Sequence, residues 1–261
     1  MMPLGWRLSA MQWDFLTETL RLERYPAPIQ VRSHGATALE RSRIQAQTSE
    51  ELSRLGLLRA GRVDADLEAA LCLLHRPASW LDSVWLPDAA ADQPVRVLAA
   101  RGGTMGICAL QHPSHPGATV LDVIPAAGLA AAVVGRLPAH PPGRSPAVTL
   151  ALSPSPDRLT QPSGGVLVSA SPVRTAVERD SAAATAILDQ PHARAGQIAA
   201  NLRDSSARMC RSPVLRWCDN RDGRYQITVA SCPDNSRSLT IASCDPHGLG
   251  EALQRLLDKL D

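Results

Sequence analysis

The chain has 261 residues, enough to bury a substantial core within one large domain or two intimate ones. Its 27 basic and 25 acidic residues nearly cancel, which excludes the strong global field expected of a protein that binds nucleic acid or anionic membranes non-specifically. Aromatic residues make up only 3% of the chain, which argues against a base-stacking surface for single-stranded nucleic acid.

The first third of the chain carries signals for three helices. Ser9 and Gln12 form a capping box, which predicts a helix starting there. Apolar periodicity predicts a second helix over residues 38–55 and a third that follows an N-cap at Asp64 and ends at Pro77. The positions expected to face the core are Trp13, Leu16, Leu20, Ile44, Thr48, Leu52, Leu55, Leu67, Ala70, Leu71 and Leu74.

Strand signals follow these helices. The Gly102-Gly103 pair predicts a tight hairpin turn between two of the strands. Pro125 suits the first position of a helix that runs to Leu137. The four strands are predicted at residues 80–86, 95–100, 104–110 and 119–124.

Residues 138–165 read as a connection between two parts of the chain. They are rich in Pro, Ser and Gly and lack periodicity, apart from one short run at residues 147–152. We expect the stretch 153–165 to be mobile.

The remainder of the chain predicts a helix, four strands and a last helix. The first of these helices opens at Ser171-Pro172 and is stopped by Pro191, and the last has Asp245 as N-cap and Pro246 at its first position. Helices and antiparallel strands therefore occur in blocks, which indicates the α+β class. The four strands are predicted at residues 197–203, 214–219, 225–231 and 238–244.

One pattern occurs twice, about 120 residues apart. The order strand, turn, strand, strand, helix covers residues 95–137 and recurs over residues 215–257, with Gly103 opposite Gly223. This repeat predicts a single pseudo-two-fold domain, residues 1–261, whose function resides on a surface. Its two similar halves would be residues 1–137 and 166–261, joined by the connection 138–165.

Alternation along the strands of the second half predicts one apolar and one polar sheet face. The apolar face would bury Ile198, Leu202, Leu215, Trp217, Tyr225, Ile227, Val229, Leu239 and Ile241. The polar face is either simply wetted by solvent or a site for a partner, and the pattern alone leaves both open. The residues of this predicted polar face are Gln197, Asn201, Arg203, Arg216, Gln226, Thr228 and Thr240.

Cysteines and histidines are dispersed along the chain. No Cys-x-x-Cys pair is present, and a chain of this size does not need disulfides to fold, so we expect reduced thiols and a cytoplasmic protein. The alternative is a small enzyme or a zinc-stabilised domain whose site is assembled from dispersed loops. Prolines 113 and 116 favour a turn over a metal site in the first group, and the second has irregular spacing. The first group is Cys108, His112 and His115; the second is Cys244 and His247 with Cys210 and Cys232.

Motifs that concentrate chemistry are missing from the sequence. There is no Gly-x-Ser-x-Gly elbow, and the glycine pair near residue 103 lacks the lysine of a phosphate loop. This favours a binding protein without cofactor over an enzyme. The most apolar window, residues 126–134, is too short to span a bilayer, so no membrane insertion is expected. Weak self-association through an exposed sheet is a further alternative.

Six segments, taken in order and spacing, carry a resemblance to a known family. They are residues 8–16 with Tyr25-Pro26, then 74–85, 101–110, 195–200, 219–225 and 239–246. Over residues 6–257 the chain resembles the EspG family of type VII (ESX) secretion chaperones of mycobacteria and related actinobacteria.

The resemblance implies a quasi-two-fold fold, with a central antiparallel sheet flanked by helical bundles. It also implies a cytosolic chaperone that binds the PPE subunit of a PE–PPE heterodimer at its apolar helical tip, keeps it soluble and delivers it to the ESX machinery. The contact surface implied is the C-terminal half of the sheet with its adjoining helices. This favours the partner-binding interpretation of the polar face.

Overall fold

The computed structural model describes the chain except for residues 1–4, 23–24, 31, 153–171, 232–235 and 261, and it describes the side chains of the fifth helix from residue 178 onward. Cys232 and the stretch 153–165, expected to be mobile, therefore lie outside the described residues. The helices are α1 (Ala10–Thr19), α2 (Ala38–Arg54), α3 (Ala65–His75), α4 (Leu129–Val134), α5 (Pro172–Leu188) and α6 (Pro246–Asp258).

The strands follow the predicted blocks, with five additions. They are β1 (Gly5–Leu8), β2 (Leu58–Arg59), β3 (Arg62–Val63), β4 (Ser79–Leu86), β5 (Val95–Gly102), β6 (Met105–Gln111), β7 (Thr119–Pro125), β8 (Val148–Leu152), β9 (Arg194–Arg203), β10 (Met209–Arg211), β11 (Leu215–Asn220), β12 (Gly223–Ser231) and β13 (Arg237–Ser243). Strands β1, β2, β3, β8 and β10 were not predicted, although β8 lies on the short run noted at residues 147–152. Each has only two to five residues, too few for alternation to show clearly.

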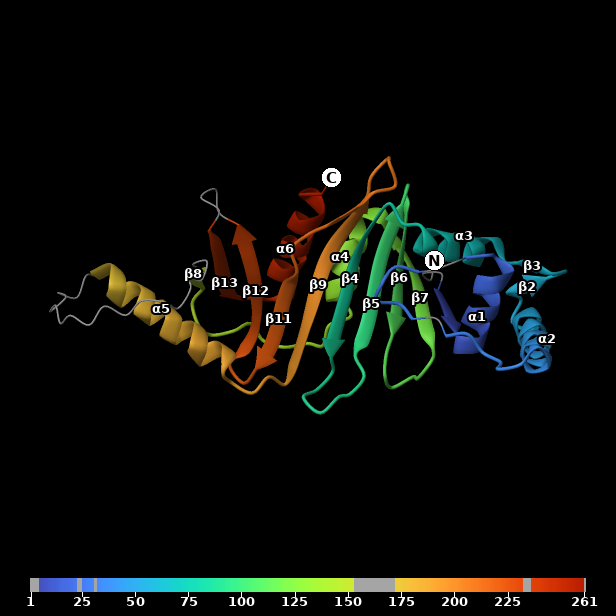
Figure 1. Cartoon of the computed structure of the whole chain (residues 1–261), viewed down its shortest axis with the longest axis horizontal. Helices are drawn as coiled ribbons and strands as arrows, with labels where there is room; N and C mark the ends of the chain where they lie inside the picture. The colour runs from blue at the N-terminus through green and yellow to red at the C-terminus, as the bar shows by residue number, and fades with distance from the viewer. Residues whose placement is uncertain (1–4, 23–24, 31, 153–171, 232–235, 261) are drawn as a thin grey trace, which may run out of the picture.

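Within the described residues, eleven strands form one sheet in the order β1-β7-β6-β5-β4-β9-β11-β12-β13-β8, with β10 beside β9 (Figure 1). Every adjacent pair is antiparallel. Outward from the central β4–β9 pair, β5, β6 and β7 on one side correspond to β11, β12 and β13 on the other. The predicted α+β class and pseudo-two-fold arrangement are confirmed. The connection contributes edge strand β8, which pairs with β13.

Predicted helix caps explain where α1 and α6 begin. The Gln12 amide donates to the Ser9 hydroxyl at 3.2 Å, and the Ser9 amide donates to the Gln12 side chain at 3.0 Å. The Gly248 amide donates to Asp245 at 2.7 Å at the start of α6. Satisfying these N–H groups fixes the first turn of each helix.

Two helix predictions needed correction. The helix expected from Pro125 to Leu137 is a short 3-10 turn followed by α4, which ends at Val134. Leu55 was expected to face the core but is 61% exposed, because α2 ends at Arg54 and Leu55 is its C-cap.

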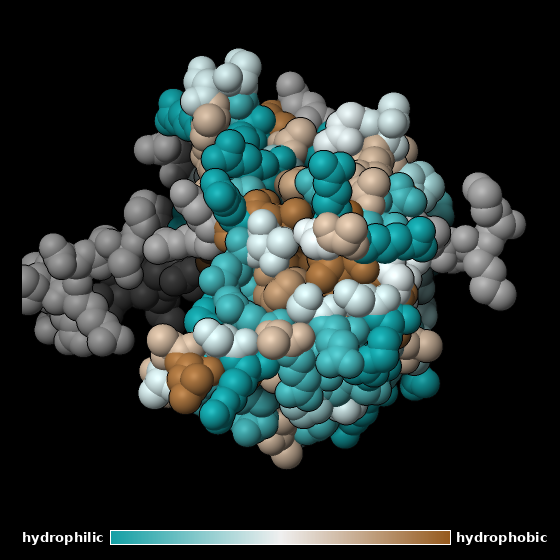
Figure 2. Space-filling view, turned by 90° about the vertical axis from the view of Figure 1, so that its right-hand side faces the viewer, coloured by the Kyte–Doolittle hydropathy of each residue, from teal (hydrophilic) through white to brown (hydrophobic). Residues whose placement is uncertain are grey.

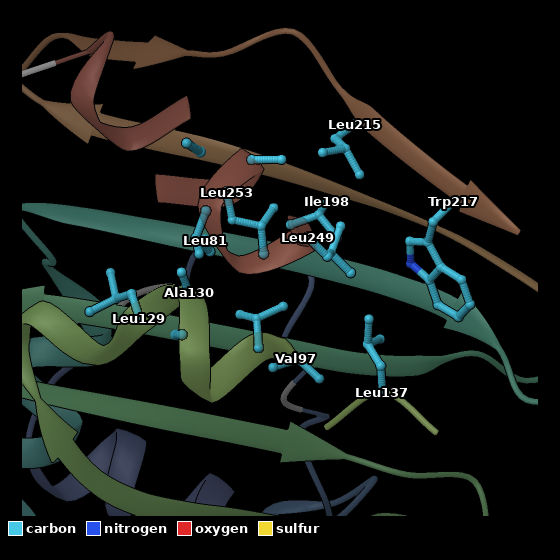
Figure 3. Packing of buried hydrophobic residues seen from close by; sticks show 14 of the residues in the cluster. Leu81, Val97, Leu129, Ala130, Leu137, Ile198, Leu215, Trp217, Leu249 and Leu253 are labelled. Carbon is cyan, nitrogen blue, oxygen red and sulfur yellow. The ribbon is translucent and has the colours of Figure 1, made fainter. Parts of the chain in front are cut away.

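One face of the sheet packs against α4 and α6. Leu81 and Ile198, from the two central strands, meet Ala130 of α4 and Leu249 and Leu253 of α6 (Figure 3). All five are at least nine-tenths buried. Deleting one of the leucines from such a core costs about 2–5 kcal/mol. This core crosses the pseudo-two-fold axis and makes the two sides of the sheet one body.

The opposite face is covered in two separate places. Helices α1 and α3 pack on β4 to β7 through a second core that includes Leu16, Leu71 and Leu98. Helix α5 packs through Ala184 and Ile187 on a third core near β8. Figure 2 views the N-terminal helical end and shows apolar surface recessed among hydrophilic residues. No helix in the described part of the chain is long and apolar enough to cross a membrane.

Candidate functional site

The predicted polar face is divided between the two faces of the sheet. Arg216 lies opposite Gln197 and Ile227, whereas Gln226 lies opposite Trp217. Because side chains of directly opposed residues share a face, Gln226 lies on the α4–α6 face together with Trp217. The prediction that all seven residues share one face was wrong. The four on the face between the helices are Gln197, Asn201, Arg203 and Arg216, and the three on the α4–α6 face are Gln226, Thr228 and Thr240.

The error has a physical cause in the β11–β12 hairpin. Asn220 pairs with Gly223 across a two-residue turn, and this register sets the side-chain parity of β12. Helices pack on both faces of this half of the sheet, so apolar side chains occur on both faces. Tyr225 and Ile227 pack under α5, while Trp217 packs under α6. Apolarity alone therefore assigned β12 to the wrong face.

On the face that carries α1, α3 and α5, none of these helices covers the middle of the sheet within the described part of the chain; we call this area the central platform. It lies on β4, β9, β10 and β11, between the second and third cores (Figure 1). Its residues are Asp82, Val84, Leu86, Gln197, Asn201, Arg203, Met209, Arg211 and Arg216.

A polar triad forms the floor of the central platform. The Asn201 amide donates to Asp82 at 2.7 Å, and the Arg211 guanidinium donates to Asn201 at 2.9 Å and to the other Asp82 oxygen at 3.0 Å. Arg211 also forms an ion pair with Asp82. Asn201 is 5% exposed, so this predicted contact residue serves as an internal bridge. Arg211, from the unpredicted strand β10, holds its guanidinium at the surface of the triad.

The exposed part of the central platform is basic with apolar ends. Arg216 and Gln197 are exposed side by side, and Arg216 makes no ion pair within the described residues. Met209 is 63% exposed at one end and Leu86 is 40% exposed at the other. Their positions opposite β9 differ by eight residues, or roughly 26 Å of strand. That span accommodates two packed helices, whose axes lie about 8–10 Å apart.

A buried ion-pair network fastens the connection to the platform's outer strand β11. The Asp219 carboxylate, fully buried, accepts two hydrogen bonds from Arg224, at 2.7 and 2.8 Å. Arg194 lies 3.1 Å from the same carboxylate. Arg224 also donates to the Pro138 carbonyl at 2.8 Å and stacks over the Trp217 ring at 4.7 Å. Every polar atom of this carboxylate is thereby used structurally.

The first Cys/His group is not assembled into a site. Cys108 is fully buried under α4, and burial raises the pKa of its thiol. His112 and His115 instead lie in the turn after β6, where both rings contact the Ser114 hydroxyl, at 2.7 and 2.9 Å. The thiol and the two imidazoles thus lie in different environments and do not form one site.

The second group is also dispersed. Burial raises the pKa of the Cys244 thiol to about 12, which keeps it protonated, and Cys210 lies on β10. His247 is exposed and faces Glu251 at 3.7 Å. Among the residues the structure describes, no three His, Cys, Asp or Glu side chains cluster as a metal site would require.

Comparison with known proteins agrees with this architecture. The family model described as "EspG family" matches residues 9–255. A solved structure of the Mycobacterium tuberculosis type VII secretion system chaperone EspG5, in complex with the PE25-PPE41 dimer, contains a chain that aligns with a TM-score of 0.69. The alignment has 15% identity and covers 98% of this chain and 96% of that one. A search of curated proteins found no match.

Proposed function

This chain belongs to the EspG family, whose model spans nearly its whole length, and from that premise we propose that it is a non-catalytic, cytoplasmic secretion chaperone. It binds a PE–PPE heterodimer through the PPE subunit, keeps the pair soluble and delivers it to a type VII (ESX) secretion system. The observation that carries the proposal is the family match over residues 9–255, together with an end-to-end fold shared with a PE–PPE-binding chaperone.

The central platform is the docking surface within this proposal. The platform exposes Arg216 and Met209, and arginine and methionine are residue types enriched at protein interfaces. The Asp82–Asn201–Arg211 triad orients the Arg211 guanidinium before binding, which lowers the entropy lost on association. A standard interface buries roughly 1,600 Å² in total, and the platform extends over roughly 26 Å of strand between Met209 and Leu86.

Co-expression with PE–PPE pairs encoded in the same genome tests the function. We expect at least one pair to become soluble and to elute with this protein as a one-to-one-to-one complex, as measured by size-exclusion chromatography with light scattering. If every pair stays insoluble, or elutes separately, the chaperone function is wrong.

A matched pair of charge substitutions tests the docking surface separately. Arg216→Glu reverses a charge on the platform, whereas Thr228→Glu adds one on the opposite face of the same sheet. We expect Arg216→Glu to weaken binding of a captured pair at least tenfold and Thr228→Glu to leave it within about twofold. Loss of binding only in Thr228→Glu would move the docking surface to the α4–α6 face while leaving the function intact.

A further inference from the structure

A cavity lies where β6 ends and β5 begins, beside the turn that joins β6 and β7. Its volume is about 420 Å³, within the range of small-molecule sites. The start of α1, the segment around Gln30, the β4–β5 loop at Gln93 and the β6–β7 turn together form its wall. The cavity is thus assembled from four separate stretches of the chain.

Side-chain hydrogen bonds hold this wall in place. Gln111 of β6 accepts a hydrogen bond from the Gln30 amide at 3.0 Å and donates to the Gln30 carbonyl at 2.8 Å. The side-chain amide nitrogen of Gln111 also donates to the Thr119 hydroxyl at 3.0 Å. Both the backbone N–H and the backbone carbonyl of Gln30, in the cavity wall, are therefore hydrogen-bonded to the sheet.

The lining of the cavity is largely apolar, with cationic and polar side chains set into it. Arg32 and Arg96 contribute two guanidinium groups, and three histidines also line it. Among the described residues, no aspartate or glutamate lines the cavity. The two guanidinium groups make the lining locally positive, while the Asp14 carboxylate lies 3.6 Å from the His34 imidazole just outside it.

His112 presents a hydrogen-bond donor even when neutral. Its Nδ1 accepts a hydrogen bond from the Ser114 backbone amide at 3.1 Å, and a backbone N–H can only donate. The ring proton of neutral His112 therefore resides on Nε2, on a ring that lines the cavity. A second cavity of about 260 Å³, with Arg7 in its wall, lies against the same turn and shares His112 and His115.

From this arrangement we propose that the cavity binds a small anion that carries a carboxylate or phosphoryl group. Guanidinium groups bind both kinds of oxyanion through paired N–H donors, and the Nε2 proton of His112 supplies a further neutral donor. The volume admits a metabolite-sized molecule, not only a single inorganic ion. This site is separate from the proposed chaperone function and does not depend on it.

Isothermal titration calorimetry of the intact protein at low ionic strength tests the site with three probes: inorganic phosphate, glycerol 3-phosphate and succinate. We expect at least one probe to bind, more weakly as salt is raised. The two phosphate probes and succinate separate phosphoryl from carboxylate recognition. Absence of binding by all three would overturn the proposal.

Variants locate the binding on the protein. Arg96→Gln removes a lining guanidinium, and we expect it to weaken the bound probe at least tenfold. Arg221→Gln, whose side chain is 83% exposed on the β11–β12 turn, is the matched control and should change affinity less than about twofold. Arg32→Gln, at an exposed position, provides a second test if Arg96→Gln does not fold. Equal affinity of the folded lining variant and wild type would overturn the site.

Discussion

Replacing Asp219 by alanine should destabilise the fold strongly, because it removes the anion from a buried network. The carboxylate is fully buried and balances Arg224, which is 2% exposed, and Arg194, which is 19% exposed. Without it, Arg224 keeps its positive charge in a position that water does not reach. Arg224 would retain only its bond to the Pro138 carbonyl and its stacking over Trp217.

The expected cost follows from this uncompensated charge. Removing one partner of a buried pair costs about 3–5 kcal/mol. The three lost charge-assisted contacts point the same way, because such hydrogen bonds are worth about 1.5–3 kcal/mol each before rearrangement. We expect about 4 kcal/mol for Asp219→Ala. That is a large share of the 5–15 kcal/mol by which proteins are typically stable.

Urea unfolding monitored by circular dichroism measures this cost as a lower midpoint at unchanged slope. Asp258→Ala, at an exposed carboxylate on α6, is the control and should change stability by less than about 0.5 kcal/mol. Combining Asp219→Asn with Arg224→Met should be less damaging than Asp219→Asn alone, because the buried charge leaves with its partner. A loss below about 1 kcal/mol in Asp219→Ala would refute the reasoning.

Three further predictions concern single sites. Gly196→Ala places a Cβ 2.4 Å from the Cβ of Trp85 and should lower the thermal midpoint strongly. Gly250→Ala has open space around it inside α6 and should raise stability by up to about 1 kcal/mol. Thermal unfolding curves that reverse this order would contradict the packing. Cys72 is exposed, so iodoacetamide should modify it before the buried Cys108, as read by mass spectrometry; first labelling at the buried thiol would contradict its burial. Burial and then repulsion by a neighbouring imidazole lower the pKa of His112 below 6.5, so the unfolded chain binds more protons in that window and stability should fall as pH drops through 6.5. An NMR titration giving a value at or above 6.5 would count against that environment.

Sequence patterns predicted the long elements well, because each carries a local signal. The capping box at Ser9 and the Asp245-Pro246 start of α6 mark helix origins through hydrogen bonds made within one turn. The strands of each repeat were recognised from alternation, and the 120-residue spacing predicted their symmetric order. Short strands such as β10 depend on pairing with a distant partner, which local patterns do not encode.

The candidate site was predicted less well, because it depends on register. A shift of one residue moves a whole strand's side chains to the other face, and here the turn between Asn220 and Gly223 decides the parity of β12. Arg211 was missed altogether, although it completes the Asp82–Asn201 triad, because its partners lie 129 and 10 residues away in the sequence. Only the β4–β9 and β9–β10 pairings bring the three together.

The seven residues of the predicted polar face lie in two different parts of the sheet. Gln226, Thr228 and Thr240 lie where β12 and β13 extend on the α4–α6 face, near the edge of the sheet. Arg216 and Gln197 lie close to the pseudo-two-fold axis, where both halves contribute strands. A partner bound there, as proposed, would touch β4 from one half and β9 from the other at once. On that proposal the repeat would contribute to recognition directly, since neither half alone would form the central platform.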